Sequence, residues 1–109
     1  SGYDQRRLAL QARSALRLAR ARAEGELRGL HRQAEALRVA AVEHRARAVA
    51  ATAELLRIAE AAYRGGESGL LELLDAYRGA LETEVTAIEL EKRAREAHIE
   101  YDLLTGSTE

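Results

Sequence analysis

The side chains with the most chemical potential in this sequence are a pair of carboxylates and three histidines. Glu72 and Asp75 are three residues apart, a spacing that places both on one face of a helix. Such a pair can attract cations, or it can simply stabilise the positive N-terminal end of a helix dipole. Catalysis would require a pocket that raises the pKa of a carboxylate, and a slender helix offers none.

The histidines are too scattered to predict a metal centre. His31 and His44 are thirteen residues apart, about 20 Å along one helix, so they cannot share an ion. His98 is expected near residue 35 if the chain folds back at its glycines, within reach of His31 and Glu35. Zinc sites usually need three or four ligands, and no HxxxH pair or His/Cys cluster is present. We therefore expect no metal site, and histidines that are solvated or packed between helices.

The sequence also lacks the motifs of common enzymes and binding classes. It contains no glycine-rich phosphate loop, zincin motif or nucleophile elbow, so we expect neither an enzyme nor a bound cofactor. A net charge of −1 argues against binding to nucleic acid. No apolar run reaches the roughly 18 residues that a membrane-spanning helix needs. The start at Ser1-Gly2, without methionine, is expected of a segment excised from a longer protein.

Composition and glycine placement predict two long helices. Proline, cysteine, methionine, tryptophan and phenylalanine are absent, while the strong helix formers alanine, leucine, arginine and glutamate dominate. We expect one helix over about 4–64, with Asp4 as its N-cap, a turn over about 65–68, and a second helix over about 69–105. A helix of sixty residues is about 90 Å long, which belongs to a coiled coil or a tube rather than to a compact domain.

Three of the eight glycines mark the reversal, at positions 65, 66 and 69. Glycine readily ends a helix in the left-handed conformation. Ser68 could then cap the next helix through its hydroxyl oxygen. The predicted fold class is therefore all-α: a long antiparallel two-helix coiled-coil hairpin with limbs of unequal length.

Each limb carries two apolar seams at alternating steps of three and four residues, where a two-helix hairpin needs only one. Two seams per helix predict two neighbours per helix, as in the wall of an α-helical barrel, although an ordinary helical bundle can also have a broad apolar face. On the first limb, one seam is Leu27, Leu30, Ala34, Leu37, Ala41, His44, Ala48, Ala51, Leu55, Ile58 and Ala62, and the other is Val39, Val42, Ala46, Val49, Ala53, Leu56 and Tyr63. On the second limb, one seam is Leu73, Ala76, Ala80, Thr83, Ala87, Leu90, Ala94, Ala97, Tyr101 and Leu104, and the other is Leu70, Leu74, Tyr77, Leu81, Val85, Ile88, Ile99 and Leu103.

Charge and length differ between the limbs. Residues 1–64 have a net charge of +6 and residues 65–109 a net charge of −7, so the fold lays a basic limb along an acidic one. Residue j of the return limb should lie opposite about 133 minus j, which leaves residues before about 27 without an intramolecular partner. Four leucines lie there, Leu8, Leu10, Leu16 and Leu18, and we expect this overhang either to self-associate or to fray.

The stretch from Tyr63 to Ala76, which reads YRGGESGLLELLDA, resembles the hairpin-tip signature of TolC-like outer-membrane efflux proteins. Their CzcC/CusC-like heavy-metal branch has a similar tyrosine, glycine, serine and LLDA-type run. The resemblance extends to the aromatic, paired leucines and glycine between Tyr101 and Gly106, and it covers roughly residues 40 to 106. It implies a hairpin from the periplasmic α-barrel of an outer-membrane protein, in a homotrimeric parent that serves as a passive conduit for metal ions or small toxic compounds.

The resemblance also implies roles for individual residues. Glu72 and Asp75 would form an acidic ring at the channel entrance, and Tyr63 would help to hold that entrance closed. The tip would dock a periplasmic adaptor (membrane fusion) protein and, through it, an inner-membrane pump. The tip residues are Gly65, Gly66, Glu67, Ser68 and Gly69. Some family members carry a basic residue where Ser68 stands, and Arg64 would have to replace it as a latch.

Two alternative hypotheses fit the same pattern. A hairpin from the adaptor protein itself, or a structural coiled-coil spacer, would have the same shape, although adaptor hairpins lack the LLDA run after the glycine. A metal-sensing helical bundle would need histidines that converge on one point. In a third alternative, the glycine-rich stretch only reverses the chain and does not dock another protein.

Overall fold

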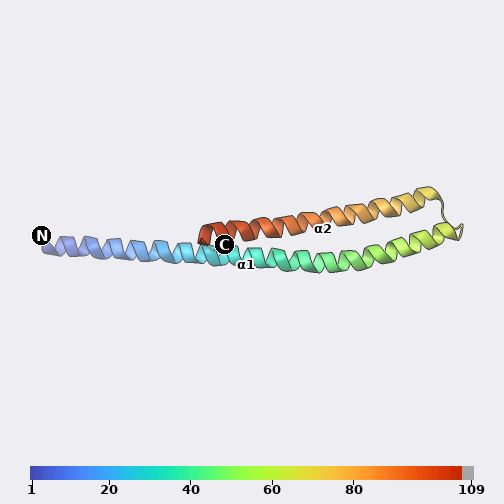
Figure 1. Cartoon of the computed structure of the whole chain (residues 1–109). Coiled ribbons are helices and arrows are strands. Elements are labelled where there is room, and N and C mark those ends of the chain that lie inside the picture. Colours follow the sequence, from blue (N-terminus) through green and yellow to red (C-terminus); the bar gives the residue numbers. More distant parts are fainter. Residues whose placement is uncertain (107–109) are drawn as a thin grey trace.

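The computed structural model describes residues 1–106, which form two helices, α1 (Gly2–Arg64) and α2 (Leu70–Thr105). Figure 1 shows α2 running back along the C-terminal part of α1, while the N-terminal part of α1 extends beyond the end of α2. The molecule measures 96 × 25 × 18 Å. The predicted fold class is confirmed: the described chain is an all-α antiparallel hairpin with limbs of unequal length.

Helix α1 begins earlier than its sequence suggested. Ser1, rather than Asp4, is the N-cap, and its hydroxyl oxygen accepts a hydrogen bond from the backbone N–H of Asp4 at 3.4 Å. Asp4 lies instead in the first turn, where its negative charge stabilises the positive end of the helix dipole. Serine and aspartate are both common N-cap residues, and capping at Ser1 rather than at Asp4 lengthens the helix by about one turn.

The turn after α1 is a Schellman motif centred on Gly66, which has a φ of 75°. The backbone N–H of Glu67 donates to the carbonyl of Ala62 at 2.9 Å, and that of Gly66 donates to the carbonyl of Tyr63 at 3.1 Å. These bonds satisfy carbonyls that the end of a helix leaves without partners. The left-handed glycine that the sequence predicted for the reversal is therefore Gly66 alone, since Gly65 is right-handed with a φ of −79°.

Ser68 does not cap α2, contrary to expectation. The N-cap is Gly69, and it has no side chain that could accept from the helix. The backbone N–H of Ser68 is used by the turn, where it donates to the carbonyl of Ala62 at 3.3 Å. Ser68 therefore belongs to the Schellman motif of α1, one residue too early to cap α2.

Alanine forms the contact between the two helices. The five buried residues of the described chain are all alanines: Ala34, Ala41 and Ala48 of α1, and Ala87 and Ala94 of α2. A methyl group lets two helix backbones approach closely, while half-buried leucines and threonines fill the spaces between the alanines. Each of these five alanines belongs to the first predicted seam of its limb, so of the two predicted seams the first is the one that forms the hairpin contact.

The predicted seam of α1 is wrong from Ala51 to Ile58 and holds again at Ala62, which is half-buried. Leu55 and Ile58 are 46% and 52% exposed, and the half-buried residues from 49 to 60 are instead Thr52, Leu56, Ala59 and Glu60. An α-helix has 3.6 residues per turn, so a strict 3.5-residue repeat drifts by about 20° per heptad unless the helices supercoil to follow it. The contact face of α1 has rotated by one residue at this point. On α2 the predicted seam holds through Tyr101, but Leu104 is 59% exposed.

The second predicted seam of each helix is open except at Leu56, which is half-buried. The seam's large apolar residues are 40% to 68% exposed on α2 and, at Val39, Val42 and Val49 of α1, 42% to 59% exposed. Residues 1–24 are also exposed throughout, so the overhang of α1 has no contact with α2. The apolar surface that the hairpin contact leaves uncovered is thus concentrated in three places: the two outer seams and the overhang.

Candidate functional site

Glu72 has a structural contact at the tip of the hairpin. Its carboxylate Oε2 accepts a hydrogen bond from the backbone N–H of Gly69 at 2.9 Å. This is the part of a capping box in which the third helical residue reaches back to the N-cap. The geometry therefore accounts for Glu72 as a helix cap, and this contact holds its carboxylate against the start of α2.

Asp75 has no such constraint. Its side chain is 77% exposed, and its nearest cation is Arg78, one turn along, with Oδ1 at 3.7 Å from Nη1. Glu72 and Asp75 lie about 100° or more around α2 from Leu74 and Leu81 of the outer seam, at about 100° per residue. A helix that covered the outer seam would leave both carboxylates open to solvent.

Tyr63 is the second-last residue of α1 and is 42% exposed. Its carbonyl accepts from Gly66 within the Schellman motif, so its backbone is part of the turn. The tip residues Gly65, Gly66, Glu67 and Gly69 are exposed, and Ser68 is half-buried. The structure thus gathers the predicted docking tip, Tyr63 and Glu72 around one reversal, with Asp75 one turn further along α2.

The sequence did not identify the polar contact that joins the two helices near their middle. The Arg45 guanidinium of α1 donates to both oxygens of Glu91, from Nη2 at 2.7 Å and from Nε at 3.2 Å, and it also donates to Glu84. These hydrogen bonds raise the pKa of Arg45, and the bond from Arg45 holds the pKa of Glu91 below its ordinary value. Opposite charges on the two limbs predicted contacts of this kind, but not which arginine makes them.

Two further polar contacts cross the hairpin. Near the tip, the Tyr77 hydroxyl donates to Glu60 at 2.6 Å, and this bond raises the pKa of Tyr77. Towards the other end, Nε2 of His98 lies 3.6 Å from Oε1 of Glu35. The predicted pairing of residue j with about 133 minus j places His98 opposite residue 35, as found, and Tyr77 about one turn from where it is found.

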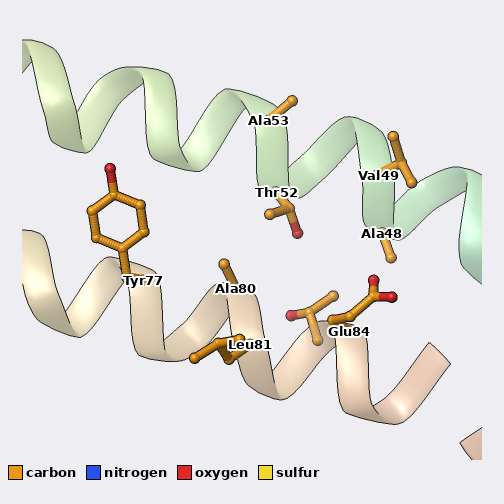
Figure 2. Close-up of a pocket in the computed structure, with 9 residues that line it drawn as sticks. Ala48, Val49, Thr52, Ala53, Tyr77, Ala80, Leu81 and Glu84 are labelled. Carbon is orange, nitrogen blue, oxygen red and sulfur yellow. The ribbon is translucent and has the colours of Figure 1, made fainter. Parts of the chain in front are cut away.

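Two apolar grooves lie on the same side of the hairpin, and both outer seams contribute to them. The groove nearer the tip, shown in Figure 2, contains Val49 and Ala53 from the outer seam of α1, and Tyr77 and Leu81 from that of α2. The aromatic ring of Tyr77 reaches from α2 toward α1 at one end of this groove. The second groove contains Val42 of α1 and Ile99 of α2 in the same way. Glu84 lines the first groove and Glu91 the second, so the Arg45 cluster lies between them.

The histidines lie apart from one another. His31 is in ring contact with Tyr101, with centroids 5.0 Å apart, and the Nε2 atom of half-buried His44 has no hydrogen-bond partner. Within residues 1–106, no group of three or more histidine, cysteine, aspartate or glutamate side chains could hold a metal ion. Over the same residues, neither helix contains an apolar stretch of the length that crosses a bilayer.

Comparison with known proteins gives no match to this chain, whether to a family model, to a curated protein or to a solved structure.

Proposed function

We propose that this chain is a periplasmic hairpin of a TolC-like outer-membrane efflux channel, one wall element of a passive conduit that exports metal ions or small toxic compounds. The observation that carries the proposal is the pair of outer seams, because apolar residues repeat along a face of each helix that the hairpin contact leaves open. In a barrel wall each helix has two neighbours, and each outer seam would contact a further helix. The parent would be a homotrimer in this proposal.

The tip geometry supports the docking part of the proposal. The reversal, with Gly65 and Gly66 in the Schellman motif and Gly69 as the N-cap of α2, exposes backbone at the end of the hairpin, where an adaptor protein could approach closely. The adaptor would link the channel to an inner-membrane pump. Glu72 and Asp75 lie beside this tip and outside the seams, so a neighbouring hairpin would not cover them. Symmetry copies of the pair would form the acidic ring of the entrance, with Tyr63 close by.

The coding sequence on either side of this segment tests the proposal directly. A TolC-like parent must also contain a signal peptide, alternating apolar segments for a small β-barrel, and a second hairpin with a similar tip. Flanking sequence without strands and without a second hairpin would refute the proposal. It would favour the alternative, a hairpin of the adaptor itself or a structural coiled-coil spacer.

The entrance residues have a test of their own in the full-length parent. Glu72→Gln combined with Asp75→Asn removes two negative charges per protomer, while glutamine can still accept the bond from Gly69. We expect a lower preference for cations in single-channel conductance, measured in planar bilayers at several salt concentrations. Unchanged cation selectivity would show that the two carboxylates only stabilise the start of α2.

A further inference from the structure

The overhang of α1 combines an apolar stripe with a strong positive charge. Its stripe consists of Leu8, Ala12, Ala15, Ala19 and Ala23, which continue the steps of three and four residues of the α1 seam, and of Leu16, which lies on the same face. All of these residues are exposed, with Leu8 at 64% and Leu16 at 62%. Residues 1–22 contain six arginines and one acidic residue, a net side-chain charge of +5. A partner for this surface must therefore be both apolar and acidic.

The outer seam of α2 has those two properties. In its tip-proximal half it presents Leu70, Leu74, Tyr77, Leu81, Val85 and Ile88, all at least 40% exposed. Carboxylates flank this seam on both sides, with Glu82 and Glu89 along one edge and, along the other, Glu84 and Glu91, which Arg45 of α1 also contacts. Residues 70–91 contain six acidic residues and one arginine, a net charge of −5.

The two surfaces cannot meet within one chain. Within the described residues the overhang begins where α2 ends, and the tip-proximal half of α2 lies at the opposite end of the 96 Å molecule. A second copy can bring them together. When two chains lie antiparallel along their full length, the overhang of each runs beside the tip-proximal half of the other's α2.

Charge decides between this pairing and the other ways of covering the overhang. Two overhangs packed on each other would place net charges of +5 and +5 side by side, and two outer seams of α2 would place −5 beside −5. Pairing the overhang with α2 joins opposite charges at both of its equivalent interfaces and closes the assembly at two copies. We therefore propose that this chain forms an antiparallel homodimer in which the basic overhang of each copy packs on the acidic outer seam of α2 of the other. This inference concerns the chain itself and is independent of the proposed channel.

The first measurement is the mass of the full 109-residue chain by sedimentation equilibrium, at about 50 mM and about 500 mM NaCl. We expect a dimer of twice 12.0 kDa at low salt, with a dissociation constant that rises by at least about tenfold at high salt. A monomer at low salt and high micromolar concentration would overturn the proposal, as would a dimer that salt does not weaken.

Charge reversal identifies the two surfaces. One variant carries Arg13→Glu, Arg17→Glu and Arg20→Glu, and the other carries Asp75→Arg, Glu82→Arg and Glu89→Arg. Glutamate and arginine are both good helix formers, so far-UV circular dichroism should show the hairpin intact in each. We expect each variant alone to dimerise at least about tenfold more weakly than the original chain, because its overhang and α2 now carry like charges.

Mixing the two variants in equal amounts should restore association. One interface of the mixed dimer joins net charges of +5 and −5 and the other joins −1 and +1, so we expect a heterodimer more stable than the dimer of either variant alone. Pairing of overhang with overhang predicts instead that the overhang variant alone associates more tightly than the original chain while the α2 variant is unchanged, and pairing of outer seam with outer seam predicts the reverse. Either of those results, or no recovery on mixing, would refute the proposed pairing.

A pair of leucines within the overhang provides a matched control. Leu16 lies in the apolar stripe, whereas Leu10 points about 120° away from Leu16, and the two are equally exposed at 62% and 61%. We expect Leu16→Gln to raise the dissociation constant at least about tenfold and Leu10→Gln to change it less than about twofold. Equal effects of the two substitutions would exclude packing through the stripe.

Discussion

Enlarging one alanine in the hairpin contact should destabilise the fold measurably. Ala34 is 0% exposed, so the methyl group is enclosed between α1 and α2. Leucine adds three carbon atoms there. If the helices could accommodate them without loss, their burial would contribute up to about 2.4 kcal/mol, at about 0.8 kcal/mol for each carbon. An enclosed site has no such room, and overpacking typically costs about 1–3 kcal/mol. We expect this cost to prevail, because separating the helices would also expose the neighbouring alanines and leucines of the seam.

Ala36 supplies the control, since it lies two residues away on the exposed side of the same helix. Ala36→Leu changes helix propensity by the same few tenths of a kcal/mol as Ala34→Leu but adds no crowding. Each kcal/mol lowers the melting temperature of a domain of this size by about 4–8 °C.

The assay is urea and thermal unfolding of both variants, followed by circular dichroism at 222 nm in high salt and at one fixed protein concentration, so that association does not contribute. A free energy of unfolding that falls by about 1–3 kcal/mol for Ala34→Leu and by less than about 0.5 kcal/mol for Ala36→Leu would agree with close packing at alanine. Equal losses, or a gain for Ala34→Leu, would refute it.

Three further predictions concern the turn, the cap and the ion cluster. Gly66→Ala should lower the free energy of unfolding by about 1 kcal/mol, because its φ of 75° disfavours a side chain, and Gly66→Asn should cost less in the same urea titration. Glu72→Ala should cost about 0.5–1 kcal/mol by removing the bond to Gly69, whereas Glu72→Gln should retain most of the stability; equal losses would show that the charge matters rather than the cap. The pKa of Glu91 is below its ordinary value in the folded chain, so its stabilising effect is present at neutral pH and is lost as the pH falls through the folded-state pKa. The unfolding free energy of Glu91→Gln, measured from pH 7 to pH 3, should therefore fall less steeply than that of the original chain, and parallel curves would contradict the role of Arg45.

Much of the fold could be predicted because its signals are local. The absence of proline, the long apolar repeats and the glycines at 65, 66 and 69 each act within a few residues, and together they predict two helices and a reversal. The position of the turn then determines the approximate pairing of the limbs, which placed His98 opposite Glu35. The overhang follows from the same arithmetic.

The candidate site was less predictable. The tip residues were found through their resemblance to a family signature, and the reversal does bring most of them together. The hydrogen bond between Glu72 and Gly69 depends on which residue is the N-cap of α2. The sequence predicted Ser68, one residue before the actual N-cap, Gly69. The Arg45 cluster escaped prediction because thirteen arginines on the first limb could have faced carboxylates on the second. Which arginine reaches two carboxylates depends on how both helices are rotated about their axes.

The sequence alone determined that this chain is helical, that it reverses at the glycines and that it approaches itself through alanine, since helix period, turn conformation and side-chain size are properties of short stretches. Tertiary structure decided which of two apolar seams on each limb is covered, and where the contact face of α1 shifts from Ala51 and Leu55 to Thr52 and Leu56. Two helices can remain in contact only on a path that suits both at once, and a repeat of 3.5 residues on a helix of 3.6 residues per turn must either supercoil or slip by one position. Where the contact face shifts depends on both helices together, so it cannot be predicted from the sequence of either limb alone.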